Sequence, residues 1–334
     1  MTNTAMLDTS DSPRTDKALI DATRPYSQEN RTLSWWVMLS TMLMLIVTLV
    51  AAASAPWWYV RLPLSILGAL LIVRNFIVYH DYLHGAILRK SWFARALMYA
   101  YGVWVLNPPR VWRQTHNYHH AHTAKLVGSH IGSYATMNLD MWAKASAAER
   151  LMYRIVRHPI TIALGYLTIF LYGMCISSFL RNPRRHWDSL LAIILHVAQS
   201  YFIYSYFGLT AYLYGLLIPM AIGCALGAYL FYAQHNFPDV DIQPRESWSY
   251  TKASLESSSF MEMNPMLHWF TGNIGYHHVH HLNPSIPFYR LPEAMAGVPE
   301  LQNPPKTSWM PSDIIACFRL KLWDPEQRRM VGYP

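Results

Sequence analysis

Half of the sixteen histidines in this sequence stand in three short groups whose spacing suits metal binding. His80 and His84 are four residues apart in HDYLH, and the other two groups combine spacings of three and four residues. These are His116, His119 and His120 in HNYHH, and His277, His280 and His281 in HHVHH. Residues three and four apart lie on one face of a helix, so each group would present two or three imidazoles together. Neutral imidazole binds zinc, copper, iron and nickel, and scattered histidines would rarely give three such groups, so we predict a metal site.

The number of clustered histidines points to two metal ions. A structural zinc ion takes four protein ligands and a catalytic one usually takes three plus water, so eight imidazoles exceed the need of one ion. His235, in FYAQHNF at the end of the last apolar segment, is a candidate ninth ligand or else a histidine at the membrane interface. We expect ordinary hydrogen-bonded roles for the isolated residues His158, His186, His196 and His268. Both a supporting role and a surface role stay open for His122, His130 and His278.

Four apolar segments are long enough to position these histidines at the ends of membrane-spanning helices. The chain is 52% hydrophobic and only 14% charged, and a helix needs about 20 apolar residues to cross a bilayer. Segments 33–55 and 62–79 are joined by a short connection, and segments 189–207 and 211–232 by a few uncharged residues. We therefore predict an all-α integral membrane protein with four transmembrane helices in two hairpins.

A fifth apolar segment, 160–180, must not cross the membrane if all the histidines are to share one face. The groups follow the second and the fourth predicted spans, so an even number of crossings must separate them. Basic residues flank the fifth segment on both sides: Arg154, Arg157, Arg181, Arg184 and Arg185. Because such clusters favour the cytosolic face, we expect segment 160–180 to be re-entrant or interfacial. Both termini would then be cytosolic, and the histidines would form a di-metal site in a cytosolic helical cap.

The remaining composition limits the partners and the domain organisation. The formal net charge is +8, but the basic residues lie between apolar segments, which indicates membrane topology and not nucleic-acid binding. The three cysteines form no CxxC pair, so we expect neither a disulfide framework nor a thiolate metal site. We divide the chain into a polar cytosolic tail without a signal peptide (1–32), a membrane domain (33–295) and a C-terminal tail (296–334). Proline is frequent in this last segment, so we expect it to be irregular.

In their order and context, the three motifs resemble the histidine boxes of the membrane fatty acid desaturase family. The stretch GNIGYHHVHHLNPSIPFYRLPE around the third motif looks most like the bacterial and cyanobacterial acyl-lipid desaturases. FYAQHNF resembles the element that precedes the third box in those proteins, and the similarity extends from about residue 35 to 295. The resemblance implies a location in the bacterial plasma membrane.

The resemblance also implies an oxidoreductase that introduces a carbon–carbon double bond into an acyl chain. Such an enzyme uses O2 and a non-haem centre of two iron ions. The implied iron ligands are His80, His84, His116, His119, His120, His235, His277, His280 and His281. The substrate would be an acyl lipid or an acyl thioester. Electrons would come from a ferredoxin-like protein or from a cytochrome or flavin reductase system, because the sequence contains no haem or iron–sulfur motif of its own.

Polar residues beside the motifs are candidates to orient the imidazoles by hydrogen bonding. Asp81 lies inside the first motif, and Gln234 and Asn273 lie close to the later histidines. Asp239, Asp241 and Glu262 could serve in the same way or be solvated loop charges. The segment SHIGSYATMNLDMW (129–142) departs from the GD-type pattern that we expect in relatives, which leaves the substrate open.

Two other functions fit parts of the pattern. A hydroxylase or ketolase of a lipid or carotenoid could use the same di-iron site, since the shape of the substrate pocket decides the outcome. A non-catalytic membrane protein that binds or transports metal ions is a more distant alternative. Transporters bind ions through polar residues at mid-membrane, whereas only Arg74 and His196 lie clearly inside the predicted spans.

Overall fold

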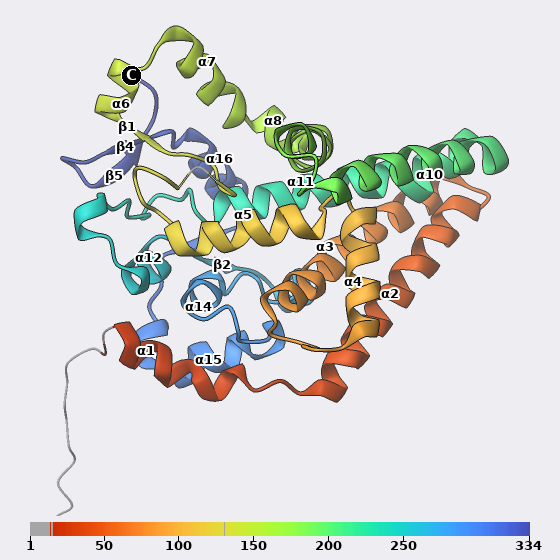
Figure 1. Ribbon diagram of the computed structural model, residues 1–334, viewed down its shortest axis with the longest axis horizontal. Coiled ribbons are helices and arrows are strands. Elements are labelled where there is room, and N and C mark those ends of the chain that lie inside the picture. Colours follow the sequence, from red (N-terminus) through yellow and green to blue (C-terminus); the bar gives the residue numbers. More distant parts are fainter. Residues whose placement is uncertain (1–13, 15, 130) are drawn as a thin grey trace, which may run out of the picture.

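The protein is mostly helical, and its first long helices form an antiparallel hairpin (Figure 1). The computed structural model describes residues 14, 16–129 and 131–334. Helix α2 (Arg31–Ser54) packs along α3 (Trp58–His84), with Gly68 close to Leu49 near one end and Arg74 bonded to Thr41 towards the other. Both helices are long and apolar enough to cross a membrane. The α3 helix starts earlier and ends later than the predicted span 62–79, so it carries the first histidine group on its last turns.

A third apolar stretch, Trp187–Ala233, contains 47 residues and is interrupted at Gly208. It comprises α10 (Trp187–Tyr212), a π-helical turn (Leu213–Leu217) and α11 (Ile218–Ala233). Gly208 has φ 83° and ψ 172°, which is not helical and is accessible mainly to glycine. As one straight helix the stretch would be about 70 Å long, more than twice the hydrocarbon core of about 30 Å. The break falls in the connection that the sequence predicts between 207 and 211.

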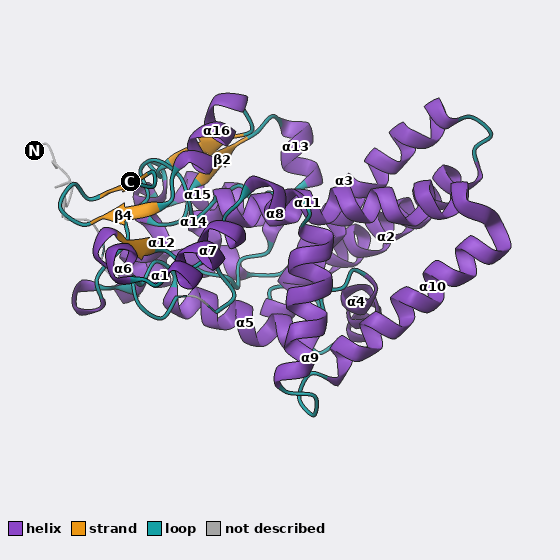
Figure 2. Cartoon of the chain, turned by 90° about the horizontal axis from the view of Figure 1, so that it is seen from above, coloured by secondary structure: helices purple, strands orange, loops and turns teal. Residues whose placement is uncertain are grey.

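Contacts with α5 (Pro109–His122) show that this stretch goes out and returns. Asp188 at the start of α10 accepts a hydrogen bond from the backbone N–H of Arg110, 2.9 Å away. His235, just after α11, lies 3.0 Å from His119 on the same helix α5. Both ends of the stretch therefore contact the same short helix, while its middle extends away from α5 (Figure 2).

The fifth apolar segment forms three short consecutive helices: α8 (Pro159–Ala163), a π-helical stretch (Tyr166–Ser177) and α9 (Ser178–Arg181). Gly165 allows this segment to approach α11 closely, because a Cβ there would lie 2.9 Å from that of Ala228. The continuous apolar helix Tyr166–Arg181 is shorter than the three stretches that could span a membrane. Its re-entrant or interfacial placement stays a prediction.

Helices α4 (Trp92–Trp104) and α5 connect the hairpin to the second histidine group. Tyr101 on α4 donates a hydrogen bond to the carbonyl of Ile72 on α3, and Tyr79 on α3 donates to the carbonyl of Asn107 before α5. Proline at the first position of α5, Pro109, suits a helix start. These bonds fix the direction of α5 relative to α3, and thus bring HNYHH next to HDYLH.

The remaining elements are short. The helices are α1 (Asp16–Thr23), α6 (Leu139–Lys144), α7 (Ala147–Val156), α12 (Tyr250–Glu256), α13 (Pro265–Phe270), α14 (His277–Leu282), α15 (Leu291–Gly297) and α16 (Pro311–Arg319). The strands are β1 (Met137–Asn138), β2 (Phe260–Glu262), β3 (Lys306–Ser308), β4 (Leu322–Asp324) and β5 (Arg329–Val331). Parallel β1 and antiparallel β5 flank β4, while β2 pairs with β3 in parallel.

The C-terminal segment 296–334 is not irregular throughout, so that sequence expectation is corrected. It contains β3, α16, β4 and β5. Pro311 occupies the start of α16, where a missing N–H costs nothing. Cys317, Trp323 and Met330 are buried in the cores formed with the rest of the chain. The prolines in this segment therefore lie near the boundaries of short helices and strands and do not prevent these elements from forming.

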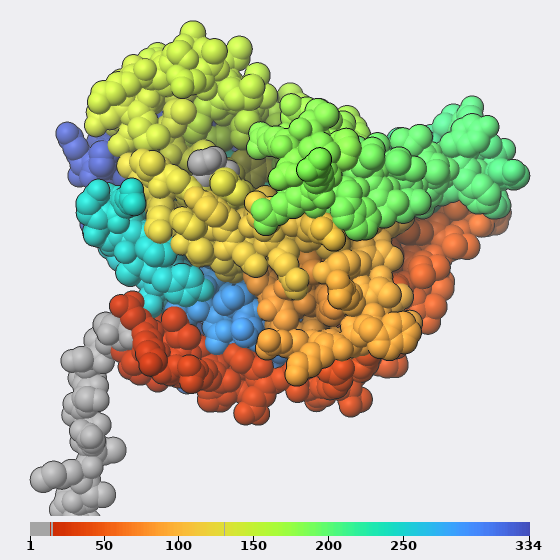
Figure 3. Space-filling model, in the orientation of Figure 1, coloured from red at the N-terminus to blue at the C-terminus, as the bar shows by residue number. Residues whose placement is uncertain are grey.

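The N-terminal tail is also structured where the structure describes it, while residues 1–13 and 15 of the predicted tail lie outside the described residues. Leu19 on α1 is buried, and Asn283 donates hydrogen bonds to the hydroxyls of Thr23 and Ser27. In the space-filling view this red segment lies directly against the blue C-terminal part of the chain (Figure 3). We call residues 16–30 the N-terminal strap.

Candidate metal centre

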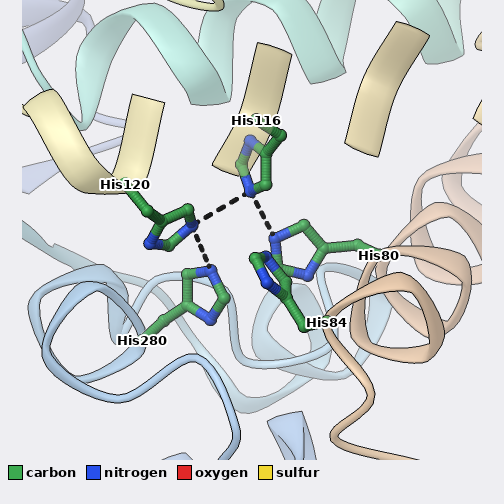
Figure 4. A group of neighbouring side chains, drawn as sticks. All are labelled: His80, His84, His116, His120 and His280. Atoms are coloured by element: carbon green, nitrogen blue, oxygen red, sulfur yellow. Dashed lines mark hydrogen bonds between the residues drawn. The ribbon is translucent and has the colours of Figure 1, made fainter. Parts of the chain in front are cut away.

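Nine histidines converge in two adjacent groups, and they are the nine that the sequence predicts. The five-histidine group contains His80, His84, His116, His120 and His280, and the four-histidine group contains His119, His235, His277 and His281. Within each group, one ring nitrogen of every member lies within 4.8 Å of those of the others. Figure 4 shows the five rings of the first group pointing toward one another from three separate segments.

Two short helices contribute to both groups, because each lies between them. On α5, His116 and His120 face the five-histidine group, while His119 faces the other. On α14, His277 and His281 face the four-histidine group, and His280 faces the first. In both helices the pair four residues apart stays together and the third histidine is directed elsewhere, as the pitch of 3.6 residues per turn allows.

The Nε2 atoms approach each other at distances that fit metal coordination. In the five-histidine group, His116 Nε2 lies 3.1 Å from those of both His80 and His120, and His280 lies 3.2 Å from His120. In the four-histidine group, the corresponding distances around His235 and His277 are 2.9 to 3.1 Å. Two donors about 2.1 Å from one ion at a right angle are about 3 Å apart. The donor sets therefore fit one ion each.

Burial keeps the imidazoles outside the membrane-spanning segments neutral. Loss of hydration lowers the pKa of His235 to about 4. Burial, with a further contribution from neighbouring histidines, lowers the pKa of the other six well below the ordinary value: His116, His119, His120, His277, His280 and His281. Neutral imidazole is the form that binds a metal, so the folded chain presents the ligands in the state that coordination requires.

Asp81 supports the five-histidine group directly. Its carboxylate accepts a hydrogen bond from His80 Nδ1 at 3.0 Å and another from the backbone N–H of Phe288 at 2.6 Å. With its proton on Nδ1, His80 leaves Nε2 free for a metal. The same carboxylate ties the first histidine motif to the segment that follows the third.

Two supporting residues of the four-histidine group escaped sequence reasoning. His235 Nδ1 donates to the carbonyl of Ser257 at 3.0 Å, which orients its Nε2 toward the group. The Thr123 hydroxyl donates to the carbonyl of His119 and lies 3.3 Å from His281 Nδ1. A backbone carbonyl carries no residue-specific signal, so Ser257 could not have been identified. Thr123, however, follows His119 by four residues on the same helix face, and that spacing was available.

The other predicted supporting residues make different contacts. Gln234 donates to the carbonyl of Leu230, and Asn273 donates to the carbonyl of Phe288, so Asn273 supports only the segment that Asp81 holds. Asp241 pairs with Lys252 and Arg328, and Glu262 pairs with Lys306. Asp239 is exposed. None of these five contacts an imidazole of the two groups through a hydrogen bond within the described residues.

The remaining described histidines have ordinary partners. His278 is fully buried between His277 and His280 in the sequence, but its ring nitrogen donates to the carbonyl of Leu301, 3.0 Å away. His122 stacks on Tyr118, with 3.9 Å between the ring centroids. Four others bond or stack outside the groups: His158, His186, His196 and His268. His130 lies outside the described residues.

Aromatic rings close the space around the imidazoles. Trp112 stacks on His116 with 4.2 Å between the ring centroids, and Phe231 lies 4.9 Å from His119. Trp112 precedes His116 by four residues, so the helical period places the two side chains together. These rings cover part of the imidazole surface, and within the described residues the Nε2 atoms of the two groups have hydrogen-bond partners only among one another.

Comparison with known proteins agrees with this arrangement. A family model described as fatty acid desaturase matches residues 56–311. A fatty acid desaturase of Bacillus subtilis is 32% identical over 273 residues, which cover 81% of this chain and 77% of the relative. An sn-1 oleoyl-lipid 12-desaturase of a Synechocystis species is 22% identical over 300 residues, covering 88% and 85%. An sn-1 acyl-lipid omega-3 desaturase (ferredoxin) of a Nostoc species is 20% identical over 246 residues, covering 67% and 63%.

The family model covers most of the chain, and the alignment with the Bacillus protein covers four fifths of it. The three histidine motifs, together with His235, supply both histidine groups. The apolar helices and the buried imidazoles match a membrane enzyme of lipid metabolism that binds metal. The chain therefore belongs to the fatty acid desaturase family and is an oxidoreductase.

Proposed function

We propose that this chain is an O2-dependent desaturase that introduces a double bond into an acyl chain of a membrane lipid, using two iron ions held by the nine histidines. The observation that carries the proposal is the pair of adjacent, buried imidazole groups at the ends of apolar helices. The Synechocystis relative is named for an oleoyl-lipid substrate, which favours a lipid over a thioester.

The chemistry of the substrate explains why redox-active metals suit this site. A methylene group has no acidic proton and no leaving group, so acid–base or nucleophilic catalysis cannot begin. Bound iron would supply O2 activation and removal of hydrogen from an unactivated carbon, whereas zinc has no redox chemistry. Desaturation takes two hydrogens from the acyl chain, and with two electrons and two protons from outside it reduces one O2 to two waters.

Residues around the two groups orient and cover the imidazoles. His80 Nδ1 stays protonated through Asp81, and His235 Nδ1 through the carbonyl of Ser257, so both keep Nε2 available. Trp112 and Phe231 cover one side of His116 and His119. The two external electrons require a partner protein. The Nostoc relative carries ferredoxin in its name, and we propose a ferredoxin-like donor here, with a cytochrome or flavin reductase system as the alternative.

We further propose that residues 33–295 form a membrane domain with four crossings in the bacterial plasma membrane. The support is that α3 ends at the histidines and that both ends of Trp187–Ala233 return to α5. Segment 160–180 would stay on the cytosolic side, with the termini and the metal site.

A topology reporter tests this arrangement. We expect a tag inserted between Arg181 and Arg185 to be cytosolic, because these residues are exposed and basic after α9. Protease protection in spheroplasts measures this directly, with a tag between Ala55 and Trp58, expected outside, as the matched control. A periplasmic signal at 181–185 would contradict the four-crossing arrangement and the shared face.

The activity itself is tested by gas chromatography–mass spectrometry of fatty acids from bacteria that express the chain together with a ferredoxin and its reductase. We expect a monoene or diene that is absent with the His280→Ala variant, and derivatisation would locate the new bond. A hydroxylated acid would replace the desaturase proposal with the hydroxylase alternative. Purified apoprotein that binds fewer than two Fe²⁺ ions per chain would contradict the di-iron centre.

A further inference from the structure

Behind the four-histidine group lies a buried arginine whose charge no carboxylate balances within the described residues. Arg157 is only 1% exposed. Its guanidinium donates to the carbonyl of Ala135 at 2.9 Å and to the side-chain oxygen of Asn236, and it lies about equally far from the rings of Tyr153 and Tyr232. Burying an ion is unfavourable unless its hydrogen bonds are made. The buried charge of Arg157 therefore restricts the positions of the groups that accept its hydrogen bonds.

A second cation reinforces that constraint. Lys321, nearly buried, donates from Nζ to the backbone carbonyl of Arg157 at 2.8 Å, and Tyr153 donates to the carbonyl of Lys321. Burial and, to a smaller extent, the positive charge of Arg157 lower the pKa of Lys321 to about 8. Residue 321 stands between α16 and β4, so these bonds join the C-terminal segment to the end of α7.

Asn236 links these bonds to His235, a residue of the candidate metal centre. It directly follows His235 and uses both ends of its amide. The oxygen accepts from Arg157, and the nitrogen donates to the carbonyls of Cys317 and Leu320 at 2.6 and 3.2 Å. On its other side, His235 is held through Nδ1 by Ser257. The backbone that carries His235 is thus fixed from two directions.

The last turns of α11 rest on the same C-terminal segment. Tyr232 stacks on Phe318 with 5.5 Å between centroids and an interplanar angle of 23°, and Tyr229 packs against both Phe318 and Trp309. Residues 306–331, which we call the C-terminal arm, therefore contact α11 immediately before His235 through aromatic rings and immediately after it through Asn236.

We infer that the C-terminal arm positions His235, through Asn236 and Arg157, and thereby sets the metal affinity of the four-histidine group. Asn236, Arg157 and the arm are positioning elements and touch no metal themselves. The five-histidine group has no member beside Asn236 in the sequence. We therefore expect that its metal affinity does not depend on the C-terminal arm. The inference rests on the proposed two-metal function.

The test is an anaerobic Fe²⁺ titration of purified, full-length apoprotein in detergent. We expect Asn236→Asp to weaken the binding of one of two ions by about 10- to 100-fold and to leave the other unchanged. The aspartate keeps the acceptor for Arg157 but cannot donate to Cys317 and Leu320, so it isolates the link to the arm. Arg328→Ala, an exposed ion-pair change in the same arm, is the matched control and should bind both ions normally.

A second background ties the effect to His235. In a His235→Ala chain, Asn236→Asp should not weaken the remaining ion further, because the residue it positions is gone. If Asn236→Asp does not fold, Arg157→Lys serves instead, since lysine keeps the charge but cannot bridge Ala135 and Asn236 as the planar guanidinium does. The same one-ion loss is expected.

Two results would overturn the inference. One is retention of two tightly bound ions in folded Asn236→Asp, and the other is an equal weakening of both ions. Failure of the wild-type chain itself to bind two ions would instead contradict the proposed function, so the two ideas fail in different ways.

Discussion

Replacement of His280 by alanine should reduce desaturation by more than about 100-fold, a larger loss than removal of a supporting residue gives. His280 is fully buried, and its Nε2 lies 3.2 Å from that of His120 within the five-histidine group. Alanine leaves four imidazoles there and a space that water can enter. We expect iron per chain to fall from two toward one, measured on purified protein alongside product formation.

The neighbouring histidine provides an unusually close control. His278 lies on the same helix and is equally buried, but it donates to the carbonyl of Leu301. His278→Gln retains a donor at that place, so it should lower stability modestly and keep two irons and turnover within a few fold of the wild type. Near-normal turnover of His280→Ala would contradict the role of His280 as a metal ligand. Loss of iron in folded His278→Gln would contradict the structural role of His278.

The second large effect is expected at Asp81, although it touches no metal. Asp81→Asn should weaken iron binding at the five-histidine group by about 10- to 100-fold. The carboxylate accepts from both His80 Nδ1 and the Phe288 N–H, whereas an amide has one oxygen. If the amide nitrogen faces His80, that imidazole must move its proton to Nε2 and cease to be a ligand. If it faces Phe288, the backbone donor loses its partner.

Fe²⁺ titration of the Asp81→Asn apoprotein measures this effect. Asp239→Asn is the matched control, because that carboxylate is exposed and was an equally plausible candidate from the sequence alone. Unchanged affinity in Asp81→Asn would show that the tautomer of His80 is set by other groups. An equal loss in Asp239→Asn would point to a general effect of charge.

Eight of the nine clustered histidines could be picked out from the sequence by helical spacing, and His235 by its place after the last apolar segment, but their division between two groups could not be predicted. In HNYHH and HHVHH the spacing indicates that three imidazoles share a helix face. The spacing does not reveal that His119 and His280 each join a different group from the other two histidines of the same motif. That depends on α5 and α14 lying between the groups, which is a tertiary fact. Asp81 was found because it lies inside a motif.

The errors have equally local causes. Gln234 and Asn273 are near the ligands along the chain, but their amides satisfy nearby carbonyls instead. The C-terminal segment was expected to be irregular because of its prolines. Two of its apolar residues instead pack against α11, where Trp309 contacts Tyr229 and Phe318 stacks on Tyr232. The break at Gly208, in contrast, falls among the few uncharged residues between the apolar segments 189–207 and 211–232, where the sequence predicts a hairpin connection.

The N-terminal strap has a consequence for the order of events during synthesis. Thr23 is bonded to Asn283, 260 residues later, and Arg290 donates to the carbonyls of Pro25 and Gln28. At a translation rate of about 5–20 residues per second, the strap waits on the order of 10 to 50 s for its binding surface to be made. During that interval the apolar helices are made, while the third histidine motif and the strap have not yet joined the first two motifs. The strap therefore docks among the last steps of assembly, after the segment that follows this motif has left the ribosome.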